Sequence, residues 1–163
     1  MKKDSRSIGL AGKIFVAAAL IAVPAFAIPQ KVTARTAQEV TFEHSKYIGL
    51  ATLLYAQDHR MTYPGAKSTS DIFKLLAPYA KAKDVFVSLN PNSKRFLFNM
   101  ALASAPVSGV LQPATTVVAY DEKEWPGRTR VVVFADGHAE IVSRSNWLVD
   151  SKSLTFKIAP KKQ

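Results

Sequence analysis

The chain has 163 residues, no cysteine and a formal net charge of +10 at pH 7. The lack of cysteine excludes disulfides and thiolate metal sites, so packing alone must hold the fold. The length suits one small domain preceded by a separate N-terminal segment. Basic residues are scattered from Lys31 to Lys162, which is typical of a solvated surface. No nucleic-acid-binding motif accompanies them, so we predict no specific nucleic acid partner.

The first 29 residues form an apolar segment behind a basic start. Residues 14–28 carry no charge, and the charged residues before them are Lys2, Lys3, Asp4, Arg6 and Lys13. A basic start keeps the N-terminus in the cytoplasm and places the rest of the chain across the membrane. Counted from Ile8, with Lys13 reaching toward the headgroups, the segment is just long enough to span a bilayer as a helix. This predicts an anchor over residues 1–29 and a single-pass inner-membrane protein of the cell envelope, with its C-terminal domain outside the cytoplasm.

The same segment also fits a secretory signal peptide. Its basic and apolar parts are followed by Ala25-Phe26-Ala27, a small-x-small cleavage pattern, and cleavage after Ala27 would release a secreted or periplasmic protein. The stretch behind Pro29 favours retention as an anchor, because it has almost no helix breaker up to His59. Both alternatives remain open from the sequence.

The segment behind Pro29 predicts an amphipathic stalk helix over residues 33–59. Apolar residues recur there at helical spacing, at Ala37, Val40, Tyr47, Ala51, Leu54 and Tyr55. A Pro-Gly pair then ends the pattern. The chain thus divides into an anchor or signal segment (1–29), a stalk helix (30–60) and a globular head (61–163).

The head is predicted to be an α+β structure. A short helix is expected over residues 72–79, behind polar N-cap residues at 68–71. Strands are predicted over residues 85–87, 115–120, 130–134, 139–142 and 153–158, with weak alternation over 95–100. We therefore expect a long N-terminal helix, made of the membrane segment and the stalk, packed on a small antiparallel sheet.

Several segments, in this order, resemble the type IV pilin and pseudopilin superfamily. Residues 27–30 resemble the AIPQ tetrapeptide late in the pilin membrane helix. HSKYIGLATLLYAQDH (44–59), IFKLLAPY (72–79) with Val85-Phe86, and VFADGHA (133–139) are similar to the branch that combines a prepilin-type N-terminus with a C-terminal H-x9-DG signature. The resemblance spans nearly the whole chain, and it implies a pilin-like fold and a role in assembly.

The chain departs from this family at five positions. Ser7 stands where the prepilin peptidase expects glycine, and Gly12 stands where pilins carry a glutamate within the apolar helix. Thr41 and Ser88 occupy the positions of family cysteines, and Pro126 occupies that of the signature histidine.

Asp136-Gly137-His138 is the cluster that most suggests a site. Its simplest interpretation is a type I′ hairpin turn, because Asp and Gly tolerate the positive φ that this turn requires. A metal or acid–base role lacks partners, since His44 and His59 lie on the predicted stalk helix with no ligand spacing.

One acidic loop could bind calcium. Asp121, Glu122 and Glu124 precede Trp125, and a hard cation needs several oxygens that converge. Nothing in the pattern fixes that convergence, which favours a solvated turn, so we predict no cofactor.

The sequence contains no catalytic motif, and we predict a non-catalytic, pseudopilin-like or minor-pilin-like structural protein. Its partners would be the membrane, other pilin-like subunits or the secretion machinery. Small residues that permit close helix packing in a bilayer are Gly9, Gly12, Ala17, Ala18 and Ala22, with Pro29 at the end of the segment. The alternatives are a basic domain that binds an anionic polymer after release at Ala27, and an exported hydrolase.

Overall fold

The computed structural model describes residues 36–152. Within this range the chain forms helices and one antiparallel sheet, which confirms the predicted α+β class. The helices are α1 (Ala37–Asp58), α2 (Thr69–Leu76) and α3 (Arg144–Asp150). The strands are β1 (Phe96–Phe98), β2 (Val117–Asp121), β3 (Thr129–Phe134) and β4 (Ala139–Ser143), and they lie side by side in chain order. Short 3-10 helices cover Ala77–Tyr79, Lys83–Phe86, Met100–Leu102 and Val107–Gly109.

Helix α1 begins at Ala37, later than the predicted start at residue 33. Thr36 before it has an extended backbone, with φ −66° and ψ 155°. Its Oγ1 accepts a hydrogen bond from Glu39 N at 3.2 Å, and its own N–H donates to Glu39 Oε2 at 2.7 Å. This reciprocal pair is a capping box, which satisfies two backbone N–H groups at the helix start. The membrane part of the predicted long helix lies outside the described residues.

Helix α1 ends in a Schellman arrangement that lacks the usual glycine. Met61 N donates to Ala56 O at 2.8 Å, and Arg60 and Met61 have φ values of 55° and 56°. Glycine is common at the position of Arg60 because it has no Cβ to crowd the left-handed backbone. The helix therefore stops where the chain leaves the right-handed region. Contacts group α1 with the sheet in one compact unit, Ala34–Gln163.

Helix α2 confirms the predicted N-cap and shifts the predicted helix toward it. Ser68 Oγ accepts a hydrogen bond from Asp71 N at 3.2 Å, so the helix begins at Thr69. The prediction placed one helix over residues 72–79, but the chain changes to a 3-10 helix at Ala77, where a proline comes next. Proline cannot donate the backbone hydrogen bond that would continue an α-helix.

The predicted strand over residues 85–87 is wrong. Lys83–Phe86 form a 3-10 helix, and Val87 makes an isolated antiparallel bridge to Arg95. The short apolar run Val85-Phe86-Val87 packs instead beside α1, where His44 Nδ1 lies 3.1 Å from Val87 O.

Strands β2, β3 and β4 confirm the strands predicted for the C-terminal third, with ends within two residues of the prediction. Strand β1 lies in the stretch of weak alternation over residues 95–100. Every neighbouring pair of strands is antiparallel, and Val131 of β3 faces Ile141 of β4. The predicted strand over residues 153–158 lies outside the described residues, and α3 occupies a stretch where no element was predicted.

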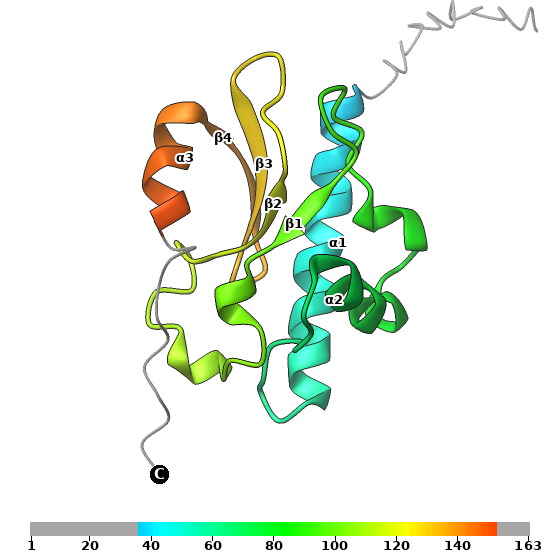
Figure 1. Ribbon diagram of the computed structural model, residues 1–163, viewed down its shortest axis with the longest axis vertical. Helices are drawn as coiled ribbons and strands as arrows, with labels where there is room; N and C mark the ends of the chain where they lie inside the picture. The colour runs from blue at the N-terminus through cyan, green and yellow to red at the C-terminus, as the bar shows by residue number, and fades with distance from the viewer. Residues whose placement is uncertain (1–35, 153–163) are drawn as a thin grey trace, which may run out of the picture. The chain divides into compact units, whose positions relative to one another are not determined.

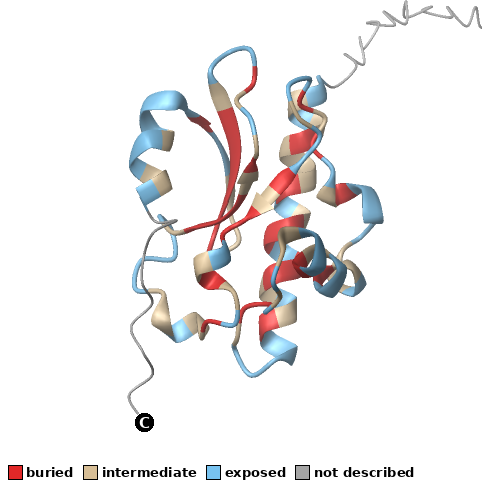
Figure 2. Ribbon diagram, in the orientation of Figure 1, coloured by how far each residue is buried: buried red, intermediate tan, exposed pale blue. Residues whose placement is uncertain are grey.

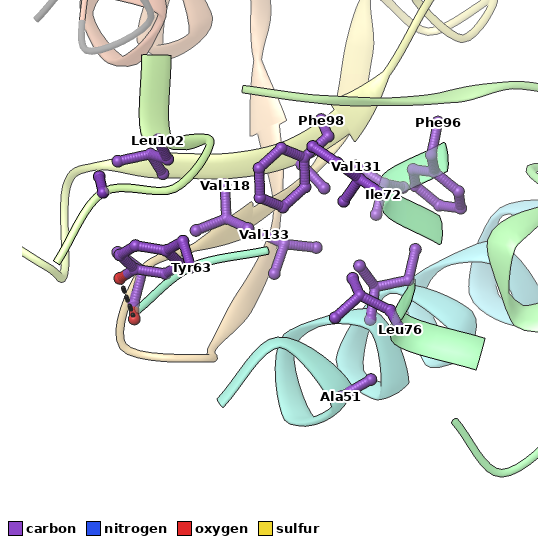
Figure 3. Close-up of a cluster of buried hydrophobic side chains, with 14 residues drawn as sticks. Ala51, Tyr63, Ile72, Leu76, Phe96, Phe98, Leu102, Val118, Val131 and Val133 are labelled. Carbon is purple, nitrogen blue, oxygen red and sulfur yellow. Dashed lines mark hydrogen bonds between the residues drawn. The ribbon is translucent and has the colours of Figure 1, made fainter. Parts of the chain in front are cut away.

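Helices α1 and α2 cover one face of the sheet, and α3 lies over the other (Figure 1). The buried residues concentrate where α1 and the sheet face each other (Figure 2). Ile48, Ile72 and Val131 are fully buried in this main core, which Figure 3 shows in close-up. Tyr63 OH donates to Ala135 O at 3.4 Å, and burial raises the pKa of Tyr63 to about 12.

The α3 side of the sheet holds a smaller cluster. Its buried members are Val117, Val132, Phe134 and Val142. Trp147 of α3 packs on Tyr120, with ring centroids 5.0 Å apart, and lies 4.5 Å from the guanidinium carbon of Arg130. Trp147 thus links α3 to the sheet through both Tyr120 and Arg130.

Candidate functional site

The tip of the β3–β4 hairpin packs directly against helix α1. A Cβ added at Gly49 would lie 2.4 Å from the Gly137 carbonyl oxygen, so the helix and the hairpin backbone touch with no room for a side chain. A Cβ added at Gly137 would lie 2.5 Å from Leu53 Cδ1. Asp136-Gly137-His138 therefore joins the sheet to α1, and a glycine on each side makes the contact possible.

The turn differs from the predicted type I′ turn. Gly137 has φ 92°, but Asp136 is not among the described residues with positive φ, which a type I′ turn requires at both central positions. Gly137 N donates to Phe134 O at 2.9 Å, and Phe134 N donates to His138 O at 2.9 Å. This is a three-residue hairpin loop with glycine in the left-handed position. The loop length depends on the pairing register of the two strands, and the Asp-Gly pair alone does not specify that register.

His138 lies between two carboxylates at this hairpin. Its Nδ1 is 2.5 Å from Asp136 Oδ1, and its Nε2 is 3.8 Å from Glu140 Oε1. The ring stacks on Phe134, with centroids 4.5 Å apart. The side chain is 38% exposed, so water competes for these contacts. These contacts fix the orientation of the His138 ring.

The described residues do not bring a metal-binding set together. Within residues 36–152, no group of three or more His, Asp and Glu residues could hold a metal ion. His44 contacts Val87 O, and His59 stacks on Tyr55 with ring centroids 3.8 Å apart.

The acidic loop directs its carboxylates to different partners. Asp121 Oδ2 accepts hydrogen bonds from Trp125 Nε1 at 2.6 Å and from Val131 N at 3.1 Å. Glu122 Oε2 accepts a hydrogen bond from Ser93 Oγ at 2.5 Å, and Glu122 Oε1 lies 3.2 Å from Arg95 Nη1. Glu124 Oε1 lies 3.9 Å from Arg144 Nε. These contacts tie the loop to its neighbours, and they leave the calcium hypothesis without support.

A group of buried polar side chains closes the end of the main core near the start of α1. Thr41, Ser88, Asn90 and Asp121 are each fully buried. Thr41 Oγ1 accepts a hydrogen bond from Leu89 N at 2.9 Å. Burial raises the pKa of Asp121, and hydrogen bonds from Ser88, Trp125 and Val131, with the charge of Arg130, offset part of that rise. Through its hydrogen bonds Asp121 ties the end of β2 to Trp125 in the following loop and to Val131 of β3.

Helix α1 also has an outward face that carries apolar residues. Ser45, Ile48 and Thr52 point toward the sheet and are buried. On the opposite side Leu50 is 50% exposed and Leu54 is 37% exposed. Tyr47 lies beside them, with the Lys81 ammonium 5.4 Å from its ring centroid. We call Tyr47, Leu50 and Leu54 the outer face of α1. Singly exposed apolar residues are common, but three on one helix face are a candidate packing surface.

The positive charge of the chain lies mostly outside the described fold. Residues 36–152 hold thirteen Lys and Arg and eleven Asp and Glu residues, which is a net charge of +2. Residues 1–35 and 153–163 hold nine basic residues and one acidic residue, which is +8 of the total of +10. Residues 36–152 are therefore almost neutral, although the whole chain is strongly basic.

The residues assigned to the membrane helix and to signal cleavage lie outside the described residues. They are Gly9, Gly12, Ala17, Ala18, Ala22, Ala25, Ala27 and Pro29. Among residues 36–152, no helix combines the length and the apolar composition that crossing a membrane requires.

Sequence reasoning missed three structural contacts. The Thr36–Glu39 capping box is visible in the sequence as Thr-x-x-Glu before an apolar run. The approach of Gly49 to Gly137 has no local signal, because it depends on how two distant segments meet. Helix α3, which carries Trp147, could have been predicted from Ser143. This residue is its N-cap, and its Oγ accepts a hydrogen bond from Asn146 N at 3.3 Å.

Comparison with known proteins gives no relative from which a role can be transferred: no family model, curated protein or solved structure matches this chain.

Proposed function

We propose that this chain is a non-catalytic structural protein of the cell envelope, pseudopilin-like or minor-pilin-like, that acts by helix packing. In this proposal residues 1–29 stay in the inner membrane as an anchor, and the head lies outside the cytoplasm. Its partners are the membrane and other pilin-like subunits or the secretion machinery. The pilin-like character rests on the sequence resemblance to that superfamily, and the mode of action rests on helix α1.

The observation that carries the proposal is the two-sided character of α1. One side of the helix is buried against an antiparallel sheet, and the outer face presents Tyr47, Leu50 and Leu54. Because the inner side of α1 is already packed, the second apolar side is available for contact with another partner. This is the arrangement that a subunit packing through its long helix needs.

The positions of two family cysteines give independent support to the resemblance. Thr41 and Ser88 are far apart in sequence, yet Thr41 Oγ1 bonds the backbone N–H of the residue directly after Ser88. Both side chains are fully buried. A chance alignment would not be expected to place two matched positions side by side in the core.

The alternative of a basic domain that binds an anionic polymer is less well supported. Such binding needs a surface with an excess of positive charge. The chain released after Ala27 would carry a net charge of +7, but residues 36–152 hold only +2 of it and the rest falls in residues 28–35 and 153–163. Several of the basic side chains there are already paired, as Lys46 is with Glu43 at 2.8 Å and Lys74 with Asp71 at 2.9 Å.

Cysteine cross-linking in envelope membranes tests the proposal, because the chain has no cysteine of its own. Leu50→Cys and Leu54→Cys should form cross-linked products under mild oxidation if the outer face packs against other subunits. Lys74→Cys, on the exposed side of α2, is the matched control and should not. Equal cross-linking at all three positions would show random collision and would overturn the proposal.

Retention of the anchor is tested separately by intact-mass measurement of the protein in the membrane fraction. A mass that includes residues 1–29 is expected. A mature protein that begins at Ile28 and is soluble outside the cytoplasm would instead establish the secreted alternative.

A further inference from the structure

The two edges of the sheet are protected to different degrees. Strand β1 forms one edge and is three residues long, and Phe98 N donates to Thr69 Oγ1 of α2 at 3.1 Å. Val87 also makes a bridge to Arg95, directly before β1. Strand β4 forms the other edge and is five residues long, and no strand within residues 36–152 pairs with its outer side. The open edge of the sheet is therefore β4.

The hydrogen bonds at both ends of the β3–β4 pair show which residues of β4 face outward. Phe134 N donates to His138 O at 2.9 Å, and Arg144 N donates to Arg128 O at 3.0 Å. Along an antiparallel pair, residues that bond the neighbouring strand alternate with residues that do not. The residues of β4 that direct their backbone groups away from β3 are therefore Ala139, Ile141 and Ser143.

Strand β4 lacks the features that most often prevent an edge strand from pairing. Proteins commonly protect such an edge with lysine, proline or a β-bulge. β4 has none of these, since it reads Ala-Glu-Ile-Val-Ser and pairs with β3 without a register shift. Ile141 is 42% exposed, although Val131 opposite it is fully buried in the main core. A large apolar side chain thus lies half exposed beside an open backbone edge.

We propose that β4 pairs with β4 of a second copy of this chain, antiparallel and around a twofold axis at Ile141. The two Ile141 residues then exchange their backbone hydrogen bonds and cover each other's side chains. Ala139 lies opposite the partner's Ser143, so all the outward residues of β4 are paired. Such a contact is isologous, because the same strand serves on both sides. The two sheets continue across the axis as one.

The charge pattern of β4 selects this register. Glu140 is the charged residue of the strand, and with the axis at Ile141 it lies opposite the partner's Val142. An axis at Glu140 would place two glutamates directly opposite each other, which is unfavourable. An axis at Val142 would leave Ala139 without a partner. The strand is therefore its own complement when Ile141 lies on the axis.

This contact does not rest on the proposed function. It uses the backbone edge of the sheet, whereas the proposed assembly uses the outer face of α1. The two proposals are tested with cysteines at different positions, so either one can fail while the other holds.

Single cysteines in the full chain test the register, because the natural sequence has none. Residues directly opposite each other in a hydrogen-bonded antiparallel pair have Cα atoms about 5.5 Å apart, which a disulfide can bridge. Under mild oxidation Ile141→Cys should form a disulfide-linked dimer. Ala139→Cys is the matched control on the same edge. It should not cross-link to itself, because its two copies lie four positions apart along the strand, about 13 Å. Mixed with Ser143→Cys, however, it should cross-link.

Ile141→Lys tests the contact without a new covalent bond. Two lysines would face each other on the axis, and the apolar contact would be lost, so we expect dimerisation to weaken about tenfold. Sedimentation of the full chain in detergent measures this change. Val87→Lys, at a position that is also 42% exposed, is the matched control and should leave dimerisation unchanged. Urea midpoints of both variants check that the fold is intact.

Several outcomes would overturn the proposal. They are no disulfide at Ile141→Cys, an equal yield from Ala139→Cys alone, and an effect of Ile141→Lys no larger than that of Val87→Lys. Hydrogen exchange of the Ile141 amide gives one more readout, because protection by a second copy must increase with protein concentration. Equal protection at every concentration would show that the same molecule covers this edge, and it would also overturn the proposal.

Discussion

The two faces of the sheet are stabilised by different amounts of buried surface. On the α1 side, fourteen buried residues from α1, α2, the strands and their loops form one cluster, whereas the α3 side has four buried residues. Burial of apolar area is the main stabilising term in a domain of this size. We therefore expect the α1 face to contribute more to the stability of the fold than the α3 face.

The largest expected effect is at the contact between α1 and the hairpin. Gly49→Ala places a Cβ 2.4 Å from the Gly137 carbonyl oxygen, a backbone atom that cannot move aside. We expect a loss of about 3 kcal/mol of unfolding free energy in urea titration. Gly127→Ala is the matched control, because nothing lies within 4 Å of its added Cβ. Equal stability of the two variants would mean that the hairpin tip does not rest on α1.

A smaller loss is expected on the other face. Trp147→Ala removes the contacts to Tyr120 and Arg130 that hold α3. Because Trp147 is only partly buried, we expect about 2 kcal/mol, below the range for fully buried aromatic residues. Hydrogen exchange should show α3 amides losing protection while α1 amides keep theirs. Leu148→Ala, at a position 62% exposed, should change neither.

The buried carboxyl of Asp121 should make the free energy of unfolding depend on pH. Burial raises the pKa of Asp121 above its ordinary value of 3.8. Between pH 3.8 and the raised pKa, this carboxyl is therefore protonated in the folded state and ionised in the unfolded chain. The contribution of Asp121 to stability therefore decreases as the pH rises from 3.8 through the raised pKa, and it is recovered on acidification.

Asp121→Asn should remove this slope, which urea midpoints measured from about pH 4 to pH 7 would reveal as a difference from wild type that changes with pH. Asp84→Asn, at an exposed position, controls for the general loss of a carboxylate. A pH-independent difference between Asp121→Asn and wild type would contradict the assignment.

The smallest effect should be a gain. Arg60 has φ 55° in the Schellman arrangement at the end of α1, where a side chain is unfavourable. Arg60→Gly should relieve that cost and raise the unfolding free energy by about 0.5–1 kcal/mol, measured by urea titration. A decrease would show that the Arg60 side chain makes a stabilising contact that outweighs its backbone.

Local signals in the sequence predicted the elements whose formation depends on interactions between residues close in the chain. The alternation of β3 and β4 and the Asp-Gly pair between them gave the hairpin, and Ser68 gave the start of α2. Predictions failed where tertiary contacts compete with propensity. The run Val85-Phe86-Val87 combines two β-branched valines with an aromatic residue, which favours a strand, but Lys83–Phe86 form a 3-10 helix beside α1.

The candidate site was harder to predict than the fold. The Asp136-Gly137-His138 cluster was correctly placed in a hairpin, but its contact with Gly49 joins residues that no local pattern connects. The three acidic residues at and after the end of β2 are close in sequence, and that closeness suggested convergence. In the structure each takes a different partner, because the chain reverses direction along the loop that carries them.

The glycine contact also sets a time order for folding. Helix α1 cannot meet the hairpin tip until residue 137 has been made, and at about 5–20 residues per second the ribosome needs several seconds to get there from residue 49. During that interval the inner side of α1, with Ile48 and Ala51, has no sheet to cover it. The order of synthesis therefore fixes the order of docking: α1 is made first, and it can pack on the sheet only after the hairpin has followed it.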